Sequence, residues 1–288
     1  LSSCPVGYRY GANELASSQD IEADTLLVAG GLYGNLEALD AIQAMAHREH
    51  RAPVVVLNGD FHFFDADAAW FRAVHERIAG APNLLATRGN VETEVARQAA
   101  AARGCGCGYP SYVAAGTAER ADAIVARLAA DAADDSVVRW LGDLPMFRTF
   151  SVGGLRVAVI HGDPDSLAGW ALAVENVPPY DSAARAVACG CGGPEGPEAS
   201  VWQTSHEEMA SFFAEAGVDA FCSTHTCLPF GQLFPGLGRG GNGSSRAGAT
   251  RNGSSSCGSM SGGGSSVGGG GSSAGIVFNN GSAGMPNF

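Results

Sequence analysis

The chain has 288 residues, of which 45% are hydrophobic and 16% are charged. That length allows one large α/β domain with a sizeable core. The formal net charge of -12 makes general binding to nucleic acids or anionic membranes unfavourable, because both partners are negatively charged. No run of eighteen apolar residues occurs, so we expect no transmembrane helix.

The first third of the chain alternates short apolar runs with amphipathic stretches. The apolar runs are rich in strand-forming residues, and the stretches between them carry apolar residues at helical spacing. The pattern predicts strands at 25–30, 53–58 and 83–87, with helices at 35–47, 66–79 and 91–103. This alternation is typical of a mainly parallel sheet with helices packed on its faces.

The rest of the chain predicts a mixture of helices, strands and a biased segment. We expect helices at 117–131, 134–142 and 203–216, and strands at 146–152, 155–160, 219–223 and 276–278. Residues 236–275 contain 16 glycines and 11 serines, which favours a flexible surface insertion. We therefore predict a single domain over 1–288, with a helical cap or insertion at about 104–145 and 165–202.

Eight cysteines leave the redox compartment open. They include two Cys-Gly-Cys pairs, 105/107 and 189/191. We expect unpaired loop thiols, with a structural zinc site or a disulfide as alternatives. The first residue, Leu1, is not a methionine, which leaves the true start of the chain open, and a cytoplasmic location is the default expectation.

Polar residues follow four predicted strands directly. These sites are Gly59-Asp60, Gly89-Asn90, His161-Gly162 and Thr224-His225. Each alone is typical of a turn or a capped histidine, but ligands of open α/β sheets bind at this edge. One carboxylate, one amide oxygen and two imidazoles together suit a divalent transition metal.

At these residues the chain resembles the calcineurin-like metallophosphoesterase superfamily. The similarity spans about 25–230 and 276–287, and includes a late loop, Asn279 to Pro286, that is similar to the family's Asn-Pro-Gly-Ser-x-Gly-x-Pro. The resemblance implies a four-layer αββα sandwich, with mixed β-sheets flanked by helices. It also implies that the metal ligands of one site are Asp60, Asn90, His161 and His225.

The neighbouring metal site of the family has lost most of its ligands in this chain. The positions that carry the family's Asp, its His and the last His are occupied here by Gly31, Tyr33 and Cys227, and only the shared Asp60 remains. We therefore expect one divalent transition metal per chain (Mn, Fe, Zn or Ni). The family's general acid is also replaced, by Val91.

Several residues are candidates for the missing roles. His62 could be a replacement ligand or proton donor, the alternative being a loop histidine bonded to backbone. Arg88 could contact a phosphate, the alternative being a surface salt bridge. Tyr33 and Cys227 could hold a second metal, or could simply fill its space.

The resemblance implies a phosphoesterase that hydrolyses a phosphomonoester or phosphodiester with a metal-activated water. The alternative is a non-catalytic or regulatory relative that binds one metal or a phosphorylated ligand. A small phosphorylated substrate is the expected partner, whereas neither its identity nor the oligomeric state follows from the sequence.

Overall fold

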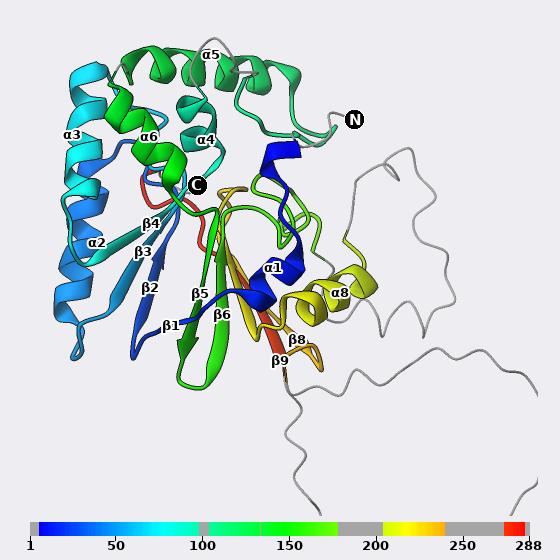
Figure 1. The fold of residues 1–288 in the computed structure, drawn as a ribbon. Coiled ribbons are helices and arrows are strands. Elements are labelled where there is room, and N and C mark those ends of the chain that lie inside the picture. Colours follow the sequence, from blue (N-terminus) through cyan, green and yellow to red (C-terminus); the bar gives the residue numbers. More distant parts are fainter. Residues whose placement is uncertain (1–5, 98–103, 133, 178–203, 240–273, 286–288) are drawn as a thin grey trace, which may run out of the picture.

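The computed structural model describes residues 6–97, 104–132, 134–177, 204–239 and 274–285 (Figure 1). Several expectations fall wholly or partly outside these ranges. They concern the end of the helix predicted at 91–103, most of the second cap segment, the cysteines at 189 and 191, and residues 240–273 of the Gly/Ser-rich insertion.

The described strands form two sheets (Figure 1). The smaller sheet has the order β2-β3-β4, and both of its pairings are parallel. Its strands are β2 (Leu26–Ala29), β3 (Val54–Asn58) and β4 (Leu84–Thr87). These elements confirm the parallel β-α-β pattern of the first third.

The larger sheet is mixed and has the order β1-β5-β6-β7-β9-β8. Its strands pair in parallel, except β5 with β6 and β8 with β9, which are antiparallel. They are β1 (Ile21–Glu22), β5 (Phe147–Val152), β6 (Leu155–Ile160), β7 (Ala220–Ser223), β8 (Phe230–Pro235) and β9 (Ala274–Asn279).

The two sheets pack face to face. Side chains alternate along each strand, so one face of a strand contacts the other sheet and its opposite face contacts helices. In β3, Val56 faces the larger sheet, whereas Val55 and Leu57 join the helices on the other side. In β6, Val157 and Val159 meet the smaller sheet, and the alternate residues join the opposite core. Strands buried on both faces read as continuous apolar runs, as these do.

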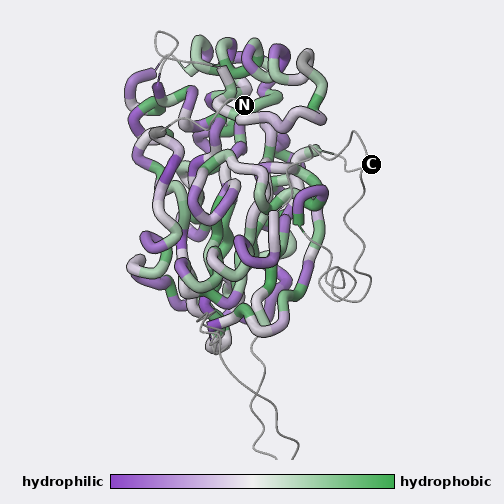
Figure 2. The backbone as a smooth tube through the Cα atoms, turned by 90° about the vertical axis from the view of Figure 1, so that its right-hand side faces the viewer, coloured by the Kyte–Doolittle hydropathy of each residue, from purple (hydrophilic) through white to green (hydrophobic). Residues whose placement is uncertain are grey.

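Helices cover the two outer faces. On the smaller sheet lie α2 (Leu36–Arg48) and α3 (Ala68–Ala79), and on the larger sheet lie α1 (Ala12–Ser17) and α8 (His206–Ala216) (Figure 1). Figure 2 shows hydrophobic stretches along the central strands, and hydrophobic and hydrophilic residues that alternate along the helix at the top. The layers are therefore helix, sheet, sheet, helix, which confirms the αββα sandwich.

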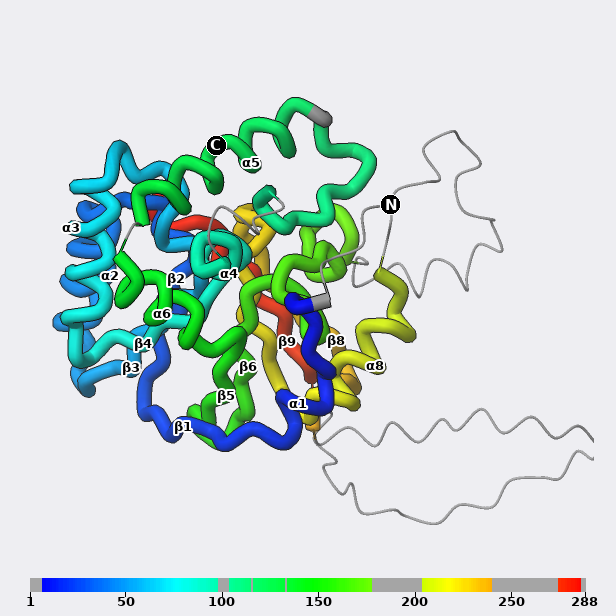
Figure 3. The backbone as a smooth tube through the Cα atoms, turned by 45° about the horizontal axis from the view of Figure 1, so that its top comes forward, coloured from blue at the N-terminus to red at the C-terminus, as the bar shows by residue number. Residues whose placement is uncertain are grey.

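Three further helices lie at one end of the sandwich. They are α4 (Asn90–Ala96), α5 (Ala115–Asp131) and α6 (Asp135–Asp143), and α5 crosses above α4 (Figure 3). Buried residues Leu128 and Leu141 of α5 and α6 share one core with Phe71 and Val95 of α3 and α4. Among the described residues, no helix has both the length and the apolar character needed to cross a membrane.

The structure also contains elements that the sequence did not predict. These are α1, β1, β8 and a short 3-10 helix, Val6–Tyr8. In addition, β9 begins at Ala274, inside the segment predicted as a flexible insertion. Because Pro235 of β8 pairs with Ala274, the two ends of the Gly/Ser-rich segment meet at one point of the sheet.

Candidate metal centre

The predicted ligands lie where strands of the two sheets end. Asp60 follows β3, Asn90 begins α4 after β4, His161 follows β6, and His225 follows β7. One residue joins these ends: the Nδ2 atom of Asn58 donates to the carbonyl of Ile160 at 2.6 Å and to that of Cys222 at 3.3 Å. This buried amide therefore sets the spacing between the sheets at the edge that carries the site.

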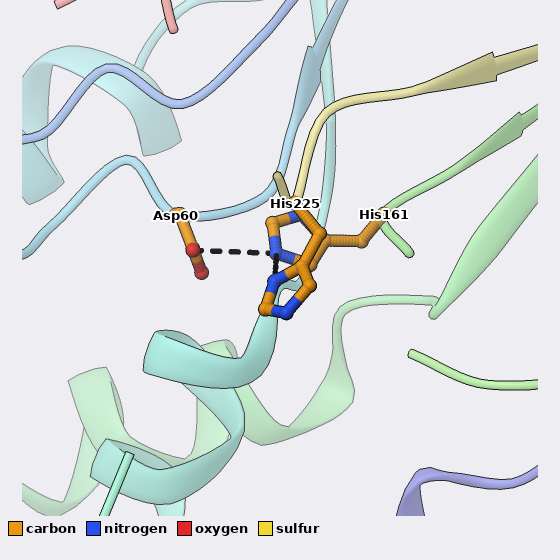
Figure 4. A group of neighbouring side chains, drawn as sticks. All are labelled: Asp60, His161 and His225. Atoms are coloured by element: carbon orange, nitrogen blue, oxygen red, sulfur yellow. Dashed lines mark hydrogen bonds and ion pairs between the residues drawn. The ribbon is translucent and has the colours of Figure 1, made fainter. Parts of the chain in front are cut away.

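The four predicted side chains come together around the Nε2 atom of His161. That atom lies 3.3 Å from Oδ2 of Asp60, 3.2 Å from Oδ1 of Asn90 and 3.3 Å from Nδ1 of His225. One ligand atom each of Asp60, His161 and His225 lies within 4.8 Å of the others (Figure 4). All four residues are buried, with His161 at 0% exposure.

The hydrogen bonds around this cluster leave lone pairs facing one another. The Nδ1 atom of His161 lies 2.9 Å from the Asn58 carbonyl, which can only accept, so in the neutral ring the proton sits on Nδ1 and the lone pair on Nε2. The amide of Asn90 donates to the carbonyl of Cys105 at 2.9 Å, which turns its oxygen toward His161. The Nε2 atom of His225 is buried and has no hydrogen-bond partner among the described residues.

Such converging acceptors need a positive charge between them, either a proton or a metal ion. Two imidazole nitrogens, one carboxylate and one amide oxygen fit a divalent transition metal. The second ring nitrogen of His161 is oriented by a backbone carbonyl, as is usual for a ligating histidine. The residues present therefore fit the metal that the resemblance implies.

Without a metal, the positive charge falls on His161. Burial alone would lower the pKa of His161, but the Asp60 carboxylate beside it raises that pKa above its ordinary value. Burial would likewise raise the pKa of Asp60, and His161 instead holds it below the usual range. Burial and the proximity of His161 lower the pKa of His225 to about 3, so His225 is neutral.

A residue that the sequence analysis did not single out holds the Asp60 loop. The buried Glu92 carboxylate accepts backbone N–H groups from Asp60 at 2.7 Å, Gly89 at 2.8 Å, Phe61 at 3.1 Å and His62 at 3.3 Å. It lies three residues after Gly89, the N-cap of α4. The spacing of a capping box was visible in the sequence, but glycine took the place of the usual Ser or Thr.

The turn before Asp60 requires glycine. Gly59 has a φ of +71°, and a Cβ atom there would lie 2.6 Å from both the Gly89 nitrogen and the His161 Nδ1 atom. Asp60 itself has a φ of +51°, which is costly for a residue other than glycine. The hydrogen bonds to Glu92 offset this strain and aim the Asp60 carboxylate at the cluster.

Side chains occupy the region of the second, lost metal site. The Tyr33 ring lies over Gly31, where a Cβ atom would be 2.5 Å from its Cε2 atom. The Tyr33 hydroxyl and the Cys227 Sγ atom form a hydrogen bond of 2.9 Å. Burial raises the pKa of Cys227 to about 11, and burial likewise raises that of Tyr33 well above its usual range, so both groups are neutral.

The two residues predicted to be catalytic point elsewhere. The ring of His62 stacks on Phe71 at 3.9 Å and its Nδ1 atom faces the Asp65 carboxylate at 3.3 Å. Arg88 donates to the carbonyl of Gly142 at 2.5 Å, near the end of α6. The structure brings neither into the cluster, so their catalytic roles remain predictions that its geometry does not favour.

One of the Cys-Gly-Cys pairs lies beside the cluster. The Sγ atom of Cys107 accepts from the Asn90 amide at 3.2 Å, and the same amide donates to the Cys105 carbonyl. Both thiols are free, and the partner pair at 189 and 191 lies outside the described residues. In the described part of the chain, this pair orients Asn90.

No protein-family model and no curated protein matches this chain. Solved structures of similar fold include a hypothetical protein from Pyrococcus horikoshii OT3, with 14% identity and a TM-score of 0.44, covering 73% of this chain and 72% of that chain. A metallophosphoesterase from Sphaerobacter thermophilus has 14% identity and a TM-score of 0.41, covering 91% of this chain and 78% of that one. A protein serine/threonine phosphatase from Saccharomyces cerevisiae has 14% identity and a TM-score of 0.32, covering 77% of this chain and 70% of that one.

At this level of similarity no activity follows from the neighbours. The architecture of the chain and the placement of its motifs are evidence of their own: two sheets pack between helical layers, and Asp60, Asn90, His161 and His225 meet at one edge. These observations agree with the architecture that the resemblance to calcineurin-like metallophosphoesterases implies.

Proposed function

We propose that the protein is a metal-dependent phosphoesterase, which hydrolyses a phosphomonoester or phosphodiester with a single divalent cation. The observation that carries the proposal is the convergence of side-chain atoms of Asp60, Asn90 and His225 on the Nε2 atom of His161.

Different residues of the chain would bind the cation and position its ligands. Asp60, Asn90, His161 and His225 would hold the cation. When bound, it supplies a Lewis acid that polarises a phosphoryl oxygen and lowers the pKa of water. Because Asp60 is the one charged ligand and His225 is neutral, about one positive charge remains to attract a phosphate oxygen. Glu92 would hold the loop of Asp60 in place, and Asn58 would hold the strand ends that precede His161 and His225.

A second candidate is a binding protein without turnover, which takes up a phosphorylated ligand at the same centre. It is favoured by the Tyr33 ring, which lies where the neighbouring site of active relatives would begin. Val91 also stands in place of the family's general acid, and its side chain is buried. The two candidates share the cation and differ in catalysis alone.

Turnover assays on purified protein separate the candidates. The protein is stripped of metal, reloaded with Mn²⁺, Fe²⁺, Zn²⁺ or Ni²⁺, and assayed with p-nitrophenyl phosphate and bis(p-nitrophenyl) phosphate. We expect hydrolysis with at least one cation, and its loss in Asp60→Asn and His161→Ala. His75→Gln is the control, because His75 is a partly buried histidine that packs against Trp140 on the helical side of the smaller sheet.

Two results would count against the esterase. Bound cation without hydrolysis of any ester would favour the binding protein. Unchanged cation content and turnover in Asp60→Asn would show that the site has been assigned to the wrong residues.

A further inference from the structure

A cavity of about 740 Å³ opens beside the Tyr33 ring. Its walls come from the segments that follow β2 and β3, so it lies at the same sheet edge as Asp60. The lining is mainly apolar and includes three aromatic rings. The residues that matter here are Tyr33, Leu36, Glu37, Phe64, Trp70 and Met285.

Two of the rings at this cavity are exposed and one of them is held in place. Trp70 is 42% exposed and Phe64 is 52% exposed. The indole N–H of Trp70 donates to the Gly34 carbonyl at 2.7 Å, which orients the ring at the start of α3. Phe64 packs edge-on against Phe63, with ring centroids 4.8 Å apart. Exposed aromatic rings gathered at a cavity are typical of a binding surface.

Tyr33 is the wall that the cavity and the metal centre share. Its backbone N–H donates to the Asp60 carbonyl at 3.2 Å, and its hydroxyl bonds to Cys227, two residues after His225. Gly34 donates in the same way to the Phe61 carbonyl at 2.8 Å. The loop that lines the cavity therefore packs directly on the loop that carries Asp60.

The charge of the cavity selects what can enter it. Glu37 is its one ionisable acid, and no lysine, arginine or histidine is among the lining residues. A second phosphate would meet no positive charge there, and Glu37 would repel it. An uncharged planar group can instead stack on Trp70 and Phe64.

We propose that this cavity binds the aromatic portion of the phosphoester, an aryl ring or a nucleobase, while the phosphoryl group lies at the metal centre. This inference rests on the proposed function for the phosphoryl group. The stacking site itself depends on Phe64 and Trp70 alone.

The inference is tested by binding rather than by turnover. Isothermal titration of the Mn²⁺-loaded protein compares phenyl phosphate and adenosine 5′-monophosphate with inorganic phosphate and ethyl phosphate. We expect Trp70→Ala to weaken the two aromatic ligands about tenfold, because a stacking contact is lost, and to leave inorganic phosphate unchanged. Phe278→Ala is the matched control, since Phe278 is 43% exposed on β9 of the other sheet.

A second readout keeps the cavity testable if the metal centre binds no phosphate. Adenosine and phenol, which carry no phosphate, should shift the indole N–H resonance of Trp70 in NMR spectra, and Phe64→Ala should weaken that shift. Loss of phosphate binding alone would refute the proposed function but would not affect the inference that the cavity binds an aromatic group. No shift with either compound, or equal ligand affinities in Trp70→Ala and wild type, would overturn the inference. A change of sedimentation in Trp70→Ala with unchanged ligand affinity would instead identify a contact between copies of the chain.

Discussion

Replacing Glu92 by glutamine tests how the site is built. The carboxylate accepts four backbone N–H groups, two at each oxygen, at 2.7–3.3 Å. Glutamine keeps one accepting oxygen and turns an NH₂ group toward the other two donors. Hydrogen bonds to charged groups contribute roughly 1.5–3 kcal/mol each, so two lost bonds cost about 3 kcal/mol or more.

For a domain of this size, that loss lowers the melting temperature by roughly 6–12 °C. It also releases the strained Asp60 loop, so we expect divalent cation affinity to fall at least about tenfold. Urea unfolding in the presence of EDTA measures the first effect, and titration calorimetry with Mn²⁺ measures the second.

Glu94→Gln is the matched control on the same helix. Glu94 is as buried as Glu92, but one oxygen accepts both of its bonds, from Tyr8 at 2.6 Å and from Arg97 at 2.6 Å. Its other oxygen has no partner among the described residues, so glutamine can keep the oxygen that accepts both bonds. The substitution then mainly weakens the ion pair with the partly exposed Arg97, which should cost about 1 kcal/mol. Equal destabilisation by the two substitutions, or unchanged cation affinity in Glu92→Gln, would refute this account of the loop.

Three further predictions concern the centre and its lost neighbour. In the metal-free protein, the His161–Asp60 pair stabilises the fold fully between the ordinary pKa values of the two groups, 3.8 and 6.5, because the folded pKa of Asp60 lies below the first and that of His161 above the second. Urea midpoints should fall as the pH rises through the folded pKa of His161, and His161→Gln should remove that fall. Since the pKa of Cys227 is about 11, site-resolved mass spectrometry should find its alkylation by iodoacetamide at pH 8 at least about tenfold slower than that of a free thiol, and equal rates would contradict the raised pKa. Gly31→Asp alone should destabilise the protein against the Tyr33 ring, whereas adding Tyr33→His and Cys227→His should raise the bound metal from one to two equivalents; a stable single variant or one equivalent in the triple variant would contradict the assignment of that space.

Much of the fold could be predicted because its signals are local. Strands such as β3 are buried on both faces, which leaves continuous apolar runs, and helices such as α2 begin at side chains that cap them, here Asn35. Strand β8 was missed for the opposite reason. It is an edge strand with exposed Leu233, it contains Gly231, and its partner β9 follows it only after the Gly/Ser-rich segment.

The sequence offers the candidate ligands of the site, but it gives no sign of the residues that support them. The sequence predicts that Asp60 and His161 follow strand ends. The two residues lie side by side because their strands, β3 and β6, belong to two packed sheets that end at the same edge of the sandwich. The roles of Asn58 and Glu92 depend on hydrogen bonds to backbone groups distant in the sequence. Loop side chains are harder still: His62 follows Asp60 by two residues yet stacks on Phe71, away from the cluster.

The most direct test counts the cations that the protein binds. Elemental analysis after dialysis against Mn²⁺ or Zn²⁺ should give one equivalent per chain for the wild type. It should fall well below one in Asp60→Asn, Asn90→Ala, His161→Ala and His225→Ala, with circular dichroism used to check that each variant folds. Retention of a full equivalent by His161→Ala or His225→Ala would show that these side chains meet for another reason and would contradict the account.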